Sequence, residues 1–328
     1  MGRNSRGLKV FLWILTIVIL LLTVIWAARV GTTKVTLPQL YRGLFVEYDD
    51  NVAIIYDLRF PRICIAIFGG AAMAVSGLLL QAVMRNPLAD PGVLGISSGA
   101  GVVASAILLF VPKLFFYTPI LSFFGGMVTF LLVYMLAWHK GELSPLRIIL
   151  VGIAINAMNM GFMTALDGMT AANGVKPPMG ISMKTWEDFY IMVGYIIAGL
   201  ILALILSGRC NLLALEDKTV ASLGLNTAAN RLVISAVAVL LASICTAVTG
   251  PISFLGLIVP HIARLIIGSN HRELVPYSII LGALVFLIAD TVGRTIMPPI
   301  EISAAIIMAI VGGPFFIFLL KKTGKNYG

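Results

Sequence analysis

The sequence contains repeated long runs of apolar residues, and these runs limit the fold more than any other feature. A helix that crosses the hydrocarbon core of a bilayer needs about 20 mostly apolar residues. Hydrophobic residues make up 59% of the chain and charged residues only 11%, whereas soluble domains carry about 25% charged residues. We therefore predict an all-α integral membrane protein embedded in a lipid bilayer.

About ten segments of the chain are long and apolar enough to span a membrane. They lie near residues 8–28, 63–84, 93–111, 118–138, 146–166, 189–207, 231–249, 251–268, 276–296 and 302–320, and form one transmembrane domain over residues 1–328. The seventh and eighth are nearly continuous, and we divide them at Pro251 because proline cannot continue a helix hydrogen-bond ladder. The first is too long for the apolar core of a signal peptide and is expected to remain as a span.

The charged residues between the apolar runs indicate how the spans are oriented. If both termini are cytoplasmic, the inner loops carry an excess of Lys and Arg over acidic residues, and the outer segments are balanced. Membrane proteins show this positive-inside bias. The net charge of +9 therefore reflects topology. Because the basic residues are scattered over short loops, we expect no nucleic-acid binding.

A polar stretch, "QAVMRNPLADPGVLGISSGAG" at residues 81–101, interrupts the apolar runs. Pro87 pushes Asn86 out of the helical region and ends the second span. Asp90 can cap the third helix, with Pro91 at its first position. The Gly, Ser and Ala residues that follow allow close helix contacts within a membrane. A capped turn followed by a tight helix contact explains much of this composition.

Four ordered blocks of sequence resemble the FecCD-type permease family, the transmembrane subunits of iron-chelate and vitamin B12 ABC importers. The blocks lie at residues 58–101, 250–276, 289–296 and 312–320. The resemblance implies a type II ABC importer permease fold in the bacterial plasma (inner) membrane, paired with a second permease copy or a paralogue. It also implies two ATP-binding subunits and an extracellular or periplasmic substrate-binding protein.

The chain lacks the GxxxxGK[ST] phosphate loop that would bind ATP. We therefore expect a separate ATPase subunit to hold ATP and Mg, with no cofactor and no enzymatic activity in this chain. The three histidines have no partner at metal-ligand spacing and predict no metal site. The three cysteines form no CxxC pair and are expected to be apolar packing residues.

The long inner loop at residues 209–231 is where the family resemblance places contact with the ATPase. A short helix on the cytoplasmic face can dock in a groove through residues at helical spacing, and Gly224 is a plausible helix end. The alternative is an ordinary polar loop. The candidate coupling residues are Leu215, Glu216, Asp217, Val220, Leu223 and Gly224.

Arg59 and Arg62 precede the second span and are the candidates for docking the binding protein. In the family, comparable arginines pair with acidic residues of that protein, and an exposed guanidinium suits this task. The alternative is a pair of interfacial arginines with buried aliphatic stems. Glu301 stands in a turn where relatives can carry a basic residue, so the resemblance supports no third docking point there.

Polar residues within the spans are the candidates for a translocation path. Asn156 and Asn159 share one face of the fifth span; they either line a wet pathway or bond to a neighbouring helix, because unpaired amides are costly in lipid. Met160 and nearby methionines could form a soft lining, although flexible packing is the commoner role. Asp290 and Arg294 are spaced to neutralise each other on one helix face.

The cargo is not fixed by the sequence. Ferric siderophore is the first candidate, because it is the family's commonest cargo, and haem and cobalamin are alternatives within the family. An ion-coupled secondary transporter is a different class of hypothesis, motivated by the intramembrane amides and the Asp290–Arg294 pair. A membrane-embedded enzyme is disfavoured, since no span carries paired carboxylates, a Ser/His/Asp set or an HExxH motif.

Overall fold

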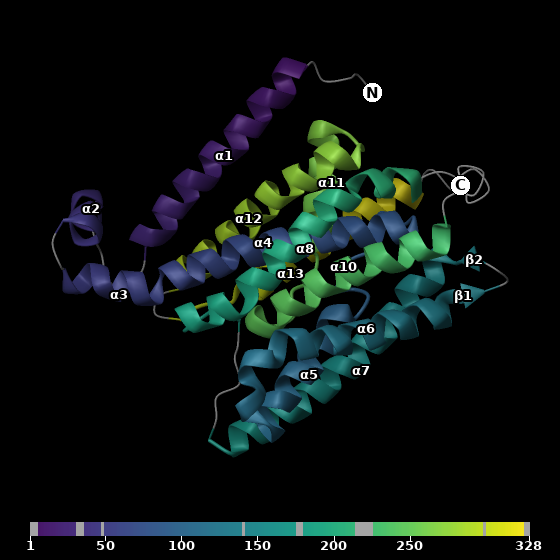
Figure 1. Cartoon of the computed structure of the whole chain (residues 1–328), viewed down its shortest axis with the longest axis horizontal. Coiled ribbons are helices and arrows are strands. Elements are labelled where there is room, and N and C mark those ends of the chain that lie inside the picture. Colours follow the sequence, from purple (N-terminus) through teal and green to yellow (C-terminus); the bar gives the residue numbers. More distant parts are fainter. Residues whose placement is uncertain are drawn as a thin grey trace.

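The computed structural model describes residues 6–30, 36–46, 49–139, 142–174, 180–213, 226–297 and 300–324, and these are helical almost throughout (Figure 1). The helices are α1 Arg6–Arg29, α2 Leu37–Phe45, α3 Asp50–Leu58, α4 Phe60–Met84, α5 Ile96–Phe110, α6 Thr118–Ala137, α7 Pro145–Ala172, α8 Trp186–Leu213, α10 Thr227–Thr249, α11 Leu255–Ile267, α12 His271–Thr295 and α13 Ala304–Gly324. A 3-10 helix, η1 Pro112–Tyr117, precedes α6, and β1 Trp138–His139 pairs antiparallel with β2 Glu142–Leu143.

Each predicted span corresponds to an apolar helix. Among the described residues, 7 helical stretches are long and apolar enough to cross a membrane. Three shorter apolar helices, α5, α11 and α13, match the remaining predicted spans. The predicted break between the seventh and eighth spans is confirmed, because α10 ends at Thr249 and α11 begins at Leu255.

Two short helices, α2 and α3, were not predicted. They lie beside the C-terminal end of α1, at one end of the bundle (Figure 1). Thr36 and Gln39 form a reciprocal capping box at the start of α2. Asp49 Oδ1 accepts a hydrogen bond of 3.2 Å from Val52 N at the start of α3. Local capping forms these helices, which are too short to stand out in a search for membrane spans.

Helix α4 lies at the centre of the bundle and is its most enclosed span. Helices α8, α10, α11 and α12 pack around it, α5, α6 and α7 form a group on one side, and α1 packs against α12 at the opposite edge (Figure 1). Glycines permit these contacts: a Cβ on Gly70 would clash with the carbonyl of Gly282, and one on Gly77 with that of Gly256. Small residues are how membrane helices pack closely.

Helices α5 and α11 are half-length and begin inside the bundle. They have 15 and 13 residues, or roughly 22 and 20 Å at 1.5 Å per residue, against a hydrocarbon core of about 30 Å. Ile96, the first residue of α5, contacts Gly126 in the middle of α6. Gly256, near the start of α11, contacts Gly77 well inside α4. The chain before each helix therefore enters the membrane region as a loop.

One end of the bundle collects basic side chains, and we call it the basic end. Lys9 Nζ and Glu273 Oε2 form an ion pair of 2.6 Å that joins the starts of α1 and α12. Arg85 Nε donates to Leu213 O at 2.7 Å, which joins the ends of α4 and α8. The basic residues gathered there are Lys9, Arg85, Arg209, Arg264 and Arg272. Helices α2 and α3 lie at the opposite end (Figure 1).

Candidate functional site

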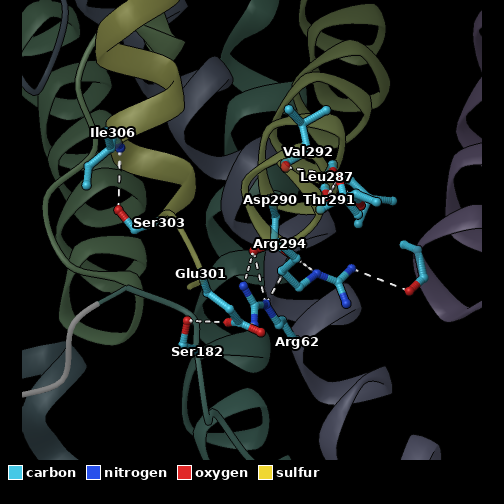
Figure 2. Close-up of polar contacts among 12 residues, drawn as sticks. Arg62, Ser182, Leu287, Asp290, Thr291, Val292, Arg294, Glu301, Ser303 and Ile306 are labelled. Atoms are coloured by element: carbon cyan, nitrogen blue, oxygen red, sulfur yellow. Dashed lines mark hydrogen bonds and ion pairs between the residues drawn. The ribbon is translucent and has the colours of Figure 1, made fainter. Parts of the chain in front are cut away.

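The end opposite the basic end holds a cluster of charged side chains, shown in Figure 2 and called here the arginine cluster. Arg62 of α4 lies between two carboxylates: Nη2 is 2.8 Å from Asp290 Oδ1, and Nη1 is 2.6 Å from Glu301 Oε2. Ser182 Oγ donates to the same Glu301 oxygen at 3.0 Å. Arg294 Nε forms an ion pair of 3.3 Å with Asp290 Oδ2. The cluster therefore balances two cations with two carboxylates.

The predicted Asp290–Arg294 neutralisation on α12 is confirmed, and Arg62 joins it from α4. The Asp290 side chain is 0% exposed. Burying a charged side chain is costly unless it is paired and hydrogen-bonded, and Asp290 accepts hydrogen bonds from both Nε and Nη2 of Arg62. These contacts join α4, α12 and the loop before α13 into one charged unit.

Both predicted docking arginines are buried within the chain, which differs from the exposed rim that the prediction assumed. Arg62 is 6% exposed and Arg59 is 9% exposed. Arg59 Nη1 donates to Ala28 O at 2.9 Å, and Arg62 is engaged by Asp290 and Glu301. The assumption of exposure is wrong because partners distant in the sequence fold onto these side chains. Docking of the binding protein on them stays a prediction.

Arg59 and Arg294 also complete the end of α1. The last carbonyls of a helix have no partner within it. Arg59 donates to the carbonyl of Ala28, and Arg294 Nη2 donates to the carbonyl of Ala27 at 3.4 Å. A positive charge near a helix C-terminus is also favourable to the helix dipole. The arginine cluster thus anchors the peripheral helix α1 to α4 and α12.

Glu301 is the accessible member of the cluster, since its side chain is 43% exposed. Partial burial alone would raise the pKa of this carboxyl, but the hydrogen bond and the charge of Arg62 outweigh it and leave the pKa below its ordinary value. Glu301 is therefore ionised at neutral pH and covers Arg62. An acidic partner from outside could reach Arg62 only by displacing Glu301.

The two predicted path asparagines of α7 have different surroundings. Asn159 is 8% exposed, and its Nδ2 donates to Gly95 O at 3.4 Å and Thr129 Oγ1 at 3.3 Å. Asn159 thus bonds to neighbouring elements, as one of the two interpretations of the sequence expected. Asn156 is half-buried and Met160 is 38% exposed. A path-lining role for Asn156, Asn159 and Met160 stays a prediction.

The predicted coupling residues Leu215, Glu216, Asp217, Val220, Leu223 and Gly224 lie outside the described residues. The flanks of the segment are described and lie at the basic end. Helix α8 ends at Leu213, whose carbonyl is held by Arg85. Helix α10 begins after Asn226, whose side chain caps it by accepting from Ala229 N at 3.0 Å. Arg209 Nη1 donates to Asn230 Oδ1 at 3.3 Å, so the two flanks are joined directly.

Asp90 connects the two half-length helices, a role that the sequence showed only in part. Its Oδ1 accepts from Gly92 N at 2.8 Å and Val93 N at 3.0 Å, in the turn before α5. The predicted helix cap is wrong, because α5 begins only after Gly95, which has no side-chain cap. Asp90 Oδ1 also lies 3.4 Å from Phe254 N, immediately before α11. Burial raises the pKa of Asp90 to about 6, although backbone N–H groups including that of Val93 oppose the shift. One carboxylate thus holds the entries of α5 and α11 together.

No local signal links Asp90 to Phe254. Their contact spans 164 positions in the chain, and each residue on its own is typical of an ordinary turn. Phe254 has a φ of +68°, a conformation that a bulky residue rarely adopts. Its N–H donates to the Asp90 carboxylate at the start of α11. The strain at Phe254 is the structural mark of this junction.

Comparison with known proteins assigns the fold to a family. Residues 19–322 match the model of the FecCD transport family. The chain belongs to this family. It is 41% identical over 321 residues to proteins named "probable heme-iron transport system permease protein IsdF" from Staphylococcus aureus strains Newman and Mu3, with 98% of each chain covered.

Solved structures agree with the family assignment. A metal-chelate type ABC transporter in an inward-facing conformation has a TM-score of 0.76 and 26% sequence identity, covering 96% of this chain and 99% of that one. PsaBC from Streptococcus pneumoniae, at 15% identity and a TM-score of 0.57, covers 86% of this chain and 95% of its own and supports the fold alone. The chain is therefore a multi-pass membrane permease of the ABC transporter family, a transport subunit rather than an enzyme, with the type II importer fold predicted from the sequence.

Proposed function

We propose that this chain is the membrane path of an ATP-driven importer that carries haem, as an iron chelate, into the cytoplasm. The observation that carries the proposal is the 41% identity to a haem-iron permease across 98% of both chains. Ferric siderophore was the first candidate from sequence, but it rested only on the family's commonest cargo. The full-length relative moves haem ahead of it.

The partners follow from the permease role. We propose that two ATP-binding subunits dock at the basic end, where the flanks of segment 209–231 meet. The positive-inside bias supports a cytoplasmic location for this end and for both termini. A second permease copy or a paralogue would complete the membrane unit, and an extracellular binding protein would deliver haem at the opposite end. ATP and Mg would be held by the partner subunits.

The half-length helices suggest how such a permease changes state. Transporter sites are often built where membrane helices are broken, and alternating access then moves one part of the bundle against another. Here Asp90 connects the turn before α5 to the residue before α11. We propose that movement of the coupling segment reaches the membrane region through this junction.

Uptake by cells that lack only this chain would test the cargo. We expect loss of labelled haem-iron uptake, unchanged uptake of a panel of ferric siderophores and of cobalamin, and recovery when the chain is restored. Unchanged haem uptake together with loss of one siderophore class would refute haem and favour the siderophore reading. Loss of cobalamin uptake alone would refute iron transport while preserving the family role.

A further inference from the structure

The function proposed above makes no use of a pocket at the basic end whose wall contains several polar and charged side chains. Its volume is about 300 Å³. It is formed where α4, α8, α11 and α12 end or begin, together with the turn after α4. The residues that matter are Gln81, Arg85, Asn86, Cys210, Arg264 and His271.

Two buried amides in the pocket wall each leave one polar atom unused. Gln81 Nε2 donates to Gly256 O at 3.0 Å, which leaves Oε1 as an acceptor. Asn86 Oδ1 accepts from Leu88 N at 2.9 Å, which leaves Nδ2 as a donor. Both residues are 4% exposed, and neither spare atom has a hydrogen-bond partner in the described part of the chain. Buried polar atoms without partners are uncommon and call for an explanation.

His271 offers a second acceptor. Asn211 Nδ2 donates to Asn270 Oδ1 at 2.8 Å, so Asn211 Oδ1 is an acceptor. This oxygen lies 2.9 Å from His271 N and 2.8 Å from His271 Nδ1, so Nδ1 carries the proton. In the neutral ring, Nε2 is then an acceptor, and it has no partner among the described residues.

Arg264 supplies an uncompensated positive charge. It is half-buried, and within the described residues it forms no ion pair or hydrogen bond. Arg85 lines the same wall, and no described acidic residue does. Removing a guanidinium from water is costly unless an anion or hydrogen bonds compensate it. The pocket therefore has the charge to bind an anion, and charge-assisted hydrogen bonds to phosphate are among the strongest that arginine makes.

We propose that this pocket binds a phosphate group that carries free hydroxyls, as found in the headgroup of phosphatidylglycerol. Arg264 and Asn86 Nδ2 donate to the phosphate oxygens, while the hydroxyls donate to Gln81 Oε1 and His271 Nε2. The pocket lies where several spans end, and the ends of membrane spans lie near the lipid headgroups. Basic pockets between membrane helices suit anionic headgroups. Inorganic phosphate shares the polar chemistry but has no acyl chains to add apolar contact.

The test uses the full chain purified in a neutral detergent, with lipid binding measured by native mass spectrometry and by thermal shift. The probes are phosphatidylglycerol, phosphatidylcholine and inorganic phosphate. We expect preferential binding of phosphatidylglycerol, reduced about tenfold or more in Arg264→Gln, since a charge-assisted bond is lost. Arg272→Gln is the matched control, because Arg272 is an exposed arginine at the same end and outside the pocket.

A second variant tests the hydroxyl contacts separately and guards against misfolding of the first. Gln81→Met keeps the charge of the pocket but removes the spare acceptor, so we expect a smaller preference for phosphatidylglycerol over phosphatidylcholine. Equal binding of all lipids, or unchanged binding in both variants, would overturn the proposal. Equally tight binding of inorganic phosphate would refute the proposal that the bound phosphate group belongs to a lipid. Loss of lipid when the ATPase subunits assemble would show instead that the partner occupies the pocket.

Discussion

The arginines at the two ends of this permease differ in whether carboxylates are paired with them. In the arginine cluster, Arg62 and Arg294 are matched by Asp290 and Glu301, and the unit anchors three helices. At the basic end, Arg264 faces a pocket with no described carboxylate. Arginines that are paired with carboxylates stabilise the fold, whereas an arginine without a carboxylate partner can bind an external anion. The difference indicates that the buried charges of one end, called here the closed end, are paired within the chain, whereas the pocket at the basic end keeps an arginine without a described carboxylate.

Of the substitutions at Asp290, Asp90 and Glu301, Asp290→Asn should destabilise the arginine cluster most. It removes the charge that both arginines share, and breaking a buried ion pair on one side costs about 3–5 kcal/mol. We expect a large drop in the thermal unfolding temperature of the purified protein. Asp167→Asn is a control, because that carboxylate is only partly buried and accepts from Ser105 Oγ at 2.7 Å. An equal drop in both variants would contradict the special status of the cluster.

The pH dependence of stability tests Asp90, which sits between the two ends. Its pKa is about 6 in the folded chain against an ordinary 3.8, so the folded state binds the proton more tightly. Stability from this group should fall as pH rises from about 4 to about 6, by at most about 3 kcal/mol. The contribution of Asp90 is obtained as the difference in unfolding free energy between the wild type and Asp90→Asn at each pH. A difference that is flat with pH would show that Asp90 titrates normally.

Glu301→Gln should have the smallest effect on stability, and it tests whether Glu301 shields Arg62 from a partner. Because Glu301 is partly exposed, its ion pair is expected to contribute about 0–1 kcal/mol. The change uncovers Arg62 at the closed end. We expect tighter association with an acidic binding protein, measured by surface plasmon resonance, and no such change for the exposed control Glu187→Gln. Weaker association would mean that Glu301 itself contacts the partner.

Much of the fold could be predicted from the sequence because membrane spans are local. Every predicted span has an apolar helix, since each depends on about 20 neighbouring residues. The half-length of α5 and α11 was missed, because apolar loop residues such as Val93, Leu94 and Ile252 extend each apolar run beyond the helix that follows. Helices α2 and α3 were missed because their caps are short-range features outside the spans.

The sites depend on contacts that no local pattern contains. Arg62 meets Asp290 across 228 positions and Glu301 across 239, so its burial could not be read from "RFPR". The Asp290–Arg294 pair was predictable because four residues on a helix bring side chains to one face. The pocket around Arg264 combines four helices and appears only in three dimensions.

Transport by the reconstituted complex would test the central claim most directly. The chain would be assembled with its ATPase and binding protein in proteoliposomes, and labelled haem entry would be followed with ATP or a non-hydrolysable analogue, with and without an ionophore. The account predicts entry that requires hydrolysable ATP and is unaffected by the ionophore. Haem entry that proceeds without ATP and collapses with the ionophore would contradict it and favour an ion-coupled transporter.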